Sequence, residues 1–175
     1  MDDQAIKNLY PQRRYPRLHS YDYSWQGAYF VTLCTVGKLC LFGEVKEGIM
    51  KLNLFGEVVE SVWKEIPLHY PEASGEVFIV MPNHVHGIIE IHETGRSGSK
   101  PDPTKSHPLS EIVRGFKTYS SRRINGLRNA QGTPVWQRSY SEHVIRSETD
   151  YHQIGGYILF NPAKWETDSE NPSGG

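Results

Sequence analysis

Two proline-containing motifs, far apart in the chain, set the tightest limits on how it can fold. The first contains His84 and His86, and the second contains Tyr157 and Asn161. Side chains alternate along a strand, so both imidazoles lie on one face if the first motif is extended. Residues four apart share one face of a helix, so Tyr157 and Asn161 lie together if the second motif is helical. If that helix packs over that strand, His84, His86 and Asn161 can hold a divalent cation, with Tyr157 beside it as a nucleophile.

Hydrophobic periodicity indicates the order of the elements around these motifs. Strand patterns cover residues 28–36, 75–81, 85–92 and 140–146, a weaker extended pattern covers 39–51, and helical patterns cover 54–68, 109–127 and 147 to just before 162. Asn53 and Ser147 are suitable N-caps for two of the helices. The order predicts an α+β fold, a ferredoxin-like antiparallel sheet with helices on one face and an added C-terminal helix that carries Tyr157.

The length and composition suit a single domain. The chain has 175 residues, 37% of them hydrophobic, which is enough for one compact core. We expect this domain to span residues 1–165, with a basic and aromatic N-terminal arm at 1–24 and a surface loop at 93–108. Residues 166–175 are polar and rich in Gly and Pro, so we expect a flexible tail there.

The cysteines and the N-terminus bear on location. Cys34 and Cys40 lie in or just after an apolar run, which favours reduced core residues over a disulfide or a zinc site. The first residues lack the pattern of a signal peptide, and no apolar run is long enough to cross a bilayer. We therefore expect a soluble cytoplasmic protein without a membrane partner.

The distribution of charge says more than its total. The net charge is only −1, yet no acidic residue lies between Glu111 and Glu142, and arginines alternate with tyrosines near the N-terminus. Basic side chains neutralise phosphates and aromatic rings stack on unpaired bases. The candidate DNA contacts are Arg13, Arg14, Arg17, Lys117, Arg122, Arg123 and Arg138. A solvated helix face and a mobile N-terminus would also explain the pattern.

Beyond these arguments, the chain resembles a known family, the HUH single-tyrosine transposases, and within it the REP-associated tyrosine transposases. The resemblance runs from about Tyr15 to Trp165. It includes Tyr29-Phe-Val-Thr, Leu41-Phe-Gly, Met81-Pro-Asn-His-Val-His, Trp136-Gln, Glu142-His-Val-Ile-Arg146 and Tyr157-Ile-x-x-Asn-Pro-x-x-Trp165. It implies Mg²⁺ or Mn²⁺, single-stranded DNA beside a hairpin, a 5′-phosphotyrosine intermediate, and strand transfer in DNA transposition by a monomer or homodimer.

Each candidate has an alternative. The histidines could be hydrogen-bonded structural residues, and Asn161 could merely end its helix, since related transposases often have Gln there. Tyr119 lies in a basic helix, but the residue four positions on is Arg123, which cannot bind a metal. Two other functions stay open, a hairpin-binding protein without catalysis and a metal-dependent hydrolase without a covalent intermediate. His143 resembles a recurrent family position, but its chemistry suggests no role.

Overall fold

The computed structural model describes residues 26–92 and 107–172. Its strands are β1 (Gly27–Cys34), β2 (Gly43–Lys46), β3 (Ile49–Leu52), β4 (Ala73–Ser74), β5 (Phe78–Val80), β6 (His84–Ile91) and β7 (Ser141–Ile145). Its helices are α2 (Leu54–Lys64), α3 (Ile66–His69), α4 (Leu109–Leu127) and α5 (Glu148–Phe160), with 3₁₀ segments η1 (Val36–Lys38) and η2 (Asn161–Thr167). Arg13, Arg14, Arg17, the rest of the predicted arm and most of the predicted 93–108 loop lie outside the described residues.

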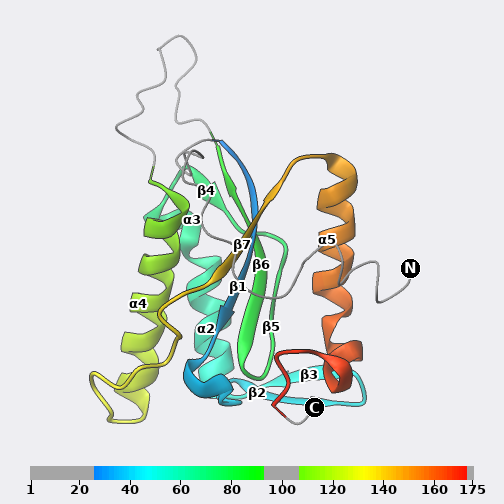
Figure 1. Cartoon of the computed structure of the whole chain (residues 1–175). Helices are drawn as coiled ribbons and strands as arrows, with labels where there is room; N and C mark the ends of the chain where they lie inside the picture. Colours follow the sequence, from blue (N-terminus) through cyan, green and yellow to red (C-terminus); the bar gives the residue numbers. More distant parts are fainter. Residues whose placement is uncertain (1–25, 93–106, 173–175) are drawn as a thin grey trace.

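The main sheet is antiparallel and has the order β4-β6-β1-β7, with β5 also paired to β6. Helices α2 and α4 cover one face and α5 covers the other (Figure 1). The predicted ferredoxin-like arrangement, with an added C-terminal helix that carries Tyr157, is confirmed. Strand β1 lies at the centre, so whatever lies on its two neighbours is brought close to it.

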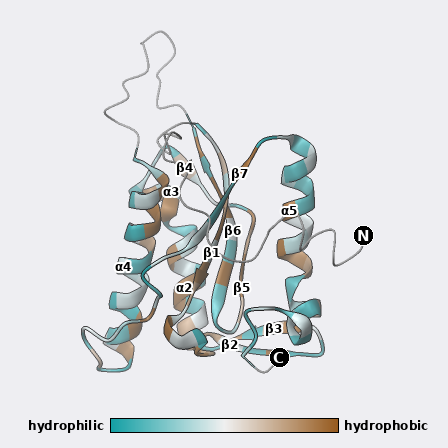
Figure 2. Cartoon of the chain, viewed as in Figure 1, coloured by the Kyte–Doolittle hydropathy of each residue, from teal (hydrophilic) through white to brown (hydrophobic). Residues whose placement is uncertain are grey.

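Side-chain alternation divides the sheet into two chemically different faces. On β6, Val85, Ile89 and Ile91 join a large apolar cluster under α2 and α4. His86 and Ile88 instead lie on the α5 face, where Ile88 packs with Phe30 of β1. Hydrophobic residues accordingly line the sheet and α2, while much of the outward side of α4 is hydrophilic (Figure 2). The prediction that the histidines avoid the most apolar face is confirmed.

The predicted caps are confirmed, but one predicted helix is interrupted. Asn53 Oδ1 accepts hydrogen bonds from the backbone N–H groups of Phe55 and Gly56, and Ser147 Oγ accepts one from that of Asp150. The helix predicted over 54–68 is split into α2 and α3 around Glu65. Pro67 lies in the first turn of α3, and its missing N–H prevents α2 from continuing through it.

The weak extended pattern at 39–51 corresponds to part of a separate hairpin, β2–β3. Its turn residues Glu47 and Gly48 both have positive φ, 53° and 72°, as a tight hairpin turn requires. Both cysteines are free; Cys34 is partly buried, but Cys40 is exposed, so its predicted place in the core is wrong. No helix within the described residues is long and apolar enough to cross a membrane.

Candidate active site

The predicted site residues meet where β6 begins, on the α5 face of the sheet. His84 and His86 lie at the start of β6, opposite Cys34 and Thr32 of β1 in the antiparallel register. Both histidines are buried, with exposed fractions of 0% and 4%. Their ring centroids are 4.4 Å apart, so the two imidazoles predicted to share a face do so.

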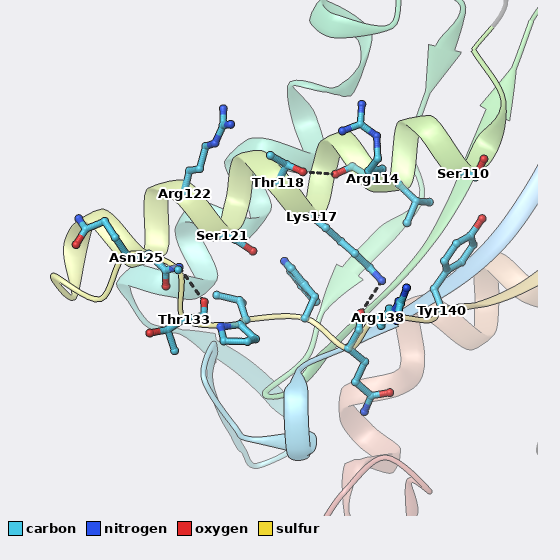
Figure 3. A pocket seen from close by; sticks show the side chains of 17 residues that line it. Ser110, Arg114, Lys117, Thr118, Ser121, Arg122, Asn125, Thr133, Arg138 and Tyr140 are labelled. Carbon is cyan, nitrogen blue, oxygen red and sulfur yellow. Dashed lines mark hydrogen bonds between the residues drawn. The ribbon is translucent and has the colours of Figure 1, made fainter.

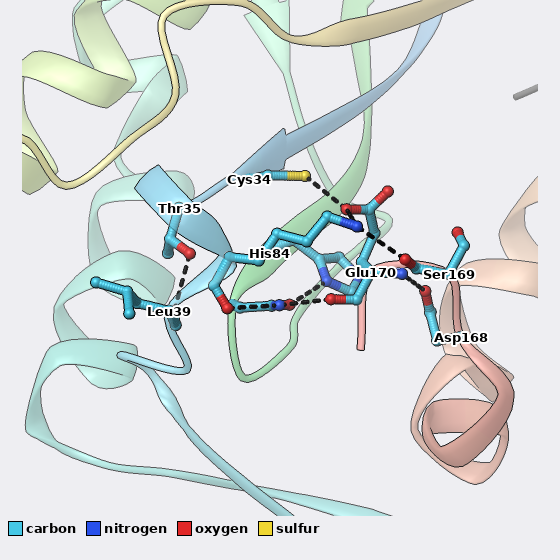
Figure 4. Close-up of polar contacts among 9 residues, drawn as sticks. Cys34, Thr35, Leu39, His84, Asp168, Ser169 and Glu170 are labelled. Carbon is cyan, nitrogen blue, oxygen red and sulfur yellow. Dashed lines mark hydrogen bonds and ion pairs between the residues drawn. The ribbon is translucent and has the colours of Figure 1, made fainter. Parts of the chain in front are cut away.

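His84 is oriented by Asn83, its neighbour in the chain (Figure 4 shows the surrounding contacts). Asn83 Nδ2 donates to the backbone carbonyls of Lys38 (3.1 Å) and Glu170 (2.6 Å), which fixes the amide orientation. Asn83 Oδ1 is then an acceptor, and it receives a hydrogen bond from His84 Nδ1–H at 2.8 Å. His84 Nε2 therefore carries a free lone pair, and this buried atom has no hydrogen-bond partner among the described residues.

His86 links the metal-ligand candidates to the predicted nucleophile. Its Nδ1 lies 2.9 Å from Thr32 Oγ1, and its Nε2 lies 3.4 Å from the Tyr157 hydroxyl. Phe30 packs against both rings, with centroid distances of 5.4 Å to His86 and 6.1 Å to Tyr157. The fold therefore places the hydroxyl of Tyr157 directly beside one of the proposed ligands.

Asn161 also reaches the site, and it brings an acidic residue with it. Its side chain is 1% exposed, and its Nδ2 donates to Asp168 Oδ2 at 3.1 Å. Because that donation fixes the amide, Oδ1 is left as an acceptor, buried and without a partner among the described residues. One ligand atom each from His84, His86 and Asp168 lie within 4.8 Å of one another. Asp168 is thus a candidate ligand that the sequence motifs did not indicate.

The segment that carries Asp168 packs against the site, although the sequence suggested a tail there. Asp168 is 9% exposed, and its Oδ1 accepts a hydrogen bond from Glu170 N at 2.7 Å. Lys38 Nζ donates to the carbonyl of Ser169 at 2.8 Å and pairs with Glu170 Oε2 at 3.2 Å. The sequence does offer one signal for Asp168, because it is an acidic residue three positions after Trp165, the last residue of the recognised motif. The polar, Gly-rich composition of residues 166–175 nevertheless favours a flexible tail.

Burial holds both histidines in the protonation state that binds metals. Loss of solvation lowers the pKa of His84 well below its ordinary value, and the neighbouring His86 lowers it further, against the opposing influence of the Asn161 side chain. Burial also lowers the pKa of His86, to about 4, against the opposing influence of Asp168. Both imidazoles are therefore neutral near pH 7, and neither needs to lose a proton to coordinate a cation.

Tyr119 and His143 are not part of the proposed metal site. Tyr119 is on α4, across the sheet from His84, and its ring stacks on His69 with centroids 4.5 Å apart. His143 Nε2 lies 3.2 Å from Asp150 Oδ2, a contact that ties β7 to the start of α5. Only Tyr157 of this rival pair is positioned to act at the proposed metal site.

The predicted DNA contacts that the structure describes do not form one group. Lys117, Arg122 and Arg138 line a hollow beside α4, whereas Arg123 forms a paired ion contact with Glu65.

Comparison with known proteins identifies relatives of this chain and a solved structure with the same fold. No model of a known protein family matches it. An uncharacterised Haemophilus influenzae protein is 40% identical over 166 residues, covering 89% of this chain and 91% of the relative, so the two belong to one family. A second protein of that organism, described as a candidate REP-associated tyrosine transposase, is 24% identical over 105 residues, which cover 59% of this chain and 57% of the relative.

A solved structure of a REP-associated tyrosine transposase bound to a REP hairpin has the same fold. The TM-score is 0.57 at 22% identity, and the match covers 87% of this chain and 73% of the other. These findings confirm the resemblance to the REP-associated tyrosine transposases that the motifs indicated.

Proposed function

We propose that this protein is a DNA transposase that uses Tyr157 and a divalent cation to cut and rejoin single-stranded DNA. The observation that carries the proposal is the 3.4 Å distance between the Tyr157 hydroxyl and His86 Nε2, next to two other buried atoms that can bind a metal. The distant similarity to REP-associated tyrosine transposases supports the same class of enzyme.

The residues present fit a cation. His84 Nε2 and Asn161 Oδ1 are buried acceptors without a partner in the described chain, and burying such atoms unpaired is costly. Together with His86 Nε2 they form the proposed ligand set, and Asp168 offers a carboxylate oxygen in addition. The mixed imidazole and oxygen donors suit Mn²⁺ somewhat better than an all-oxygen site would, and Mg²⁺ is the alternative. When bound, the cation would polarise the scissile phosphate and stabilise the charge that develops there.

The role of Tyr157 follows from its chemistry. A free phenol has a pKa of about 10, so the hydroxyl gives up its proton to solvent as its oxygen attacks the phosphorus. A bond forms between the tyrosine oxygen and phosphorus, and the bond from phosphorus to the 3′ oxygen breaks. That oxygen takes up a proton and leaves as a 3′-hydroxyl, while the other fragment stays attached to Tyr157 through its 5′-phosphate.

Rejoining is the same reaction in reverse. The 3′-hydroxyl of a second DNA end attacks the phosphotyrosine, and Tyr157 is released with its proton restored. One phosphodiester replaces another, so the cycle needs no ATP. We propose that the substrate is single-stranded DNA beside an imperfect hairpin, and that the reaction takes place in the cytoplasm. The hairpin part of this proposal is supported by the solved relative, which is bound to a REP hairpin.

The test is covalent capture. The protein is incubated with Mn²⁺ and labelled single-stranded DNA from hairpins that flank its own gene, and a denaturing gel is used to detect an adduct. We expect the adduct with the natural protein and with Tyr119→Phe, and none with Tyr157→Phe or with excess chelator. Cleavage without any adduct would instead favour a metal-dependent hydrolase, and binding without cleavage a catalytically silent protein.

A further inference from the structure

A groove lies beside the outer side of α4, away from the proposed metal site. It has a volume of about 670 Å³ and runs between α4 and residues 131–140 (Figure 3). We call it the α4 groove. Within the part of the chain that the structure describes, its lining has no carboxylate and four basic residues, Arg114, Lys117, Arg122 and Arg138. Such a one-sided set of charges attracts an anion.

Three of these cations have no acidic partner within the described chain. Lys117 Nζ donates to the backbone carbonyls of Gln137 and Ser139, each at 2.9 Å. Arg122 and Arg138 are exposed, and no ion pair involves them among the described residues. Arg114, in contrast, is paired with Glu111 on its own helix. The α4 groove therefore holds more positive charge than the described residues neutralise.

Lys117 is the partly buried cation of the α4 groove. Partial loss of solvation lowers its pKa to about 8, and the nearby Cys34 offsets only part of this effect. An anion placed in the α4 groove would favour the charged form and restore the pKa toward its ordinary value.

The remaining lining suits a nucleic acid more than a simple anion. Thr118, Ser121 and Asn125 add hydroxyl and amide groups along the helix side. On the other side lies the half-buried ring of Tyr140, which packs against the main hydrophobic cluster and has Lys117 Nζ 5.5 Å from its centroid. Phosphate-binding cations next to an aromatic ring are the combination by which proteins bind single strands without reading their sequence.

One strand, β1, lies between the segment that lines the α4 groove and the strand that carries His84. Gln137 N donates to the carbonyl of Cys34 at 2.8 Å, and on its other side Cys34 is the register partner of His84. Two adjacent strand spacings therefore separate the backbone of Gln137 from that of His84, roughly 10 Å. The α4 groove lies on the α4 side of the sheet and the proposed metal site on the α5 side (Figure 1), so a strand bound at both would pass around the edge of the sheet near residues 136–140.

From this arrangement we propose that the α4 groove binds the phosphate backbone of the single-stranded DNA segment next to the cleavage site. The inference rests on the proposed function. It selects Lys117, Arg122 and Arg138 as the contacts and leaves out Arg123, which lies next to Arg122 in sequence but is held by both oxygens of Glu65.

Fluorescence anisotropy tests the assignment in a Tyr157→Phe background, which prevents cleavage. The probes are a labelled linear single strand, a hairpin with a single-stranded flank and a blunt hairpin. We expect the double variant Arg122→Gln/Arg138→Gln to lower affinity for the first two roughly tenfold, and to reduce the slope of log K against log salt by about 1.4, since each single-strand contact contributes about 0.7. Affinity for the blunt hairpin should stay the same.

Arg123→Gln is the control for the Arg122→Gln half of the double variant, because it removes one positive charge from the neighbouring position of the same helix. We expect it to leave all three affinities unchanged. An equal loss with Arg123→Gln, an equal loss on the blunt hairpin, or no loss with the double variant would each overturn the assignment. Circular dichroism and thermal unfolding confirm that each variant is folded.

The adduct assay separates this inference from the proposed function. With Tyr157 restored, the double variant should need a higher DNA concentration than the natural protein, by the factor found in the binding assay, to form the same amount of adduct. If the natural protein forms no adduct while the binding pattern holds, the α4 groove stands and the proposed chemistry fails.

Discussion

The two faces of the sheet are held in different ways. Under α2 and α4 lies a large continuous apolar cluster that includes Trp63, Phe116 and Trp136. Under α5 the buried apolar cluster consists of Phe30, Ile88, Ile154 and Ile158, and the space beside it is occupied by the buried polar groups of the proposed site. The α2/α4 face therefore supplies most of the hydrophobic stabilisation.

The difference shows how the fold tolerates a polar site inside it. Buried imidazole, amide and carboxylate groups contribute little apolar area, and each costs free energy unless it is hydrogen-bonded. The larger cluster can offset that cost from the opposite side of the same sheet. Changes to the α5 face should then affect chemistry and local opening, and changes to the α2/α4 face should affect global stability.

The largest effect is expected from Trp63→Ala. Trp63 is fully buried between Phe78 and Phe116, and its Nε1 donates to the carbonyl of Gly75 at 2.8 Å. Its removal should lower the free energy of unfolding by about 3–5 kcal/mol. Urea denaturation measures this loss. Leu68→Ala is the control, because Leu68 is 78% exposed and its truncation should change little; similar losses in both variants would contradict the assigned core.

The next effect belongs to the α5 face alone. At a Mn²⁺ concentration about a hundredfold above its dissociation constant, binding to the folded state should add ~2.7 kcal/mol to the free energy of unfolding. Calorimetry with and without Mn²⁺ measures the increment. His84→Ala should abolish the increment whatever it does to the metal-free protein, whereas Trp63→Ala should retain it if enough folded protein remains. An increment that survives His84→Ala would place the cation elsewhere.

A smaller effect compares one methylene on each face. Ile158→Val on α5 and Ile124→Val on α4 both shorten a fully buried side chain, and each should cost about 1 kcal/mol. We expect Ile158→Val to speed hydrogen exchange mainly in α5, because few apolar contacts hold that helix. Ile124→Val should lower protection evenly across the sheet. Equal patterns in the two variants would remove the distinction between the faces.

The smallest effect is expected from Gly156→Ala in α5. Apart from its own helix, no atom of the described residues would lie within 4 Å of a Cβ at this position, and the backbone is helical, so alanine should stabilise the protein by about 0.5–1 kcal/mol. The same change at Gly87 would bring its Cβ to 2.3 Å from the ring of Trp63 and should destabilise instead.

If Gly155 and Gly156 loosen the helix of Tyr157 for rejoining, replacing both with alanine should slow strand transfer more than cleavage.

The parts of the site that follow a local period could be predicted from the sequence. Alternation along β6 placed His84 and His86 on one face, and the four-residue spacing placed Tyr157 with Asn161; the structure has both arrangements. The caps Asn53 and Ser147 were equally local. The packing of α5 against β6 is a tertiary contact. The family resemblance indicated it more than periodicity did.

Asp168 and the division of α2 from α3 were missed for a different reason. Asp168 reaches the site because the chain folds back after η2, and neither a period nor a cap encodes that turn. The apolar spacing over 54–68 predicts one helix, but Pro67 lacks the backbone N–H that a continuing helix needs and lies in the first turn of a new one. The pairing of Asn83 with Glu170, across 87 positions, likewise has no local signal.

The residues of the site lie far apart in the sequence, and this affects when the site can form during synthesis. Its parts come from β1, β6, α5 and the segment that contains Asp168, so the proposed donor set with Asp168 included is incomplete until residue 168 has left the ribosome. At ~5–20 residues per second, roughly 4–17 s pass between the synthesis of His84 and that of Asp168. A nascent chain without Asp168 already carries both histidines but lacks the full donor set.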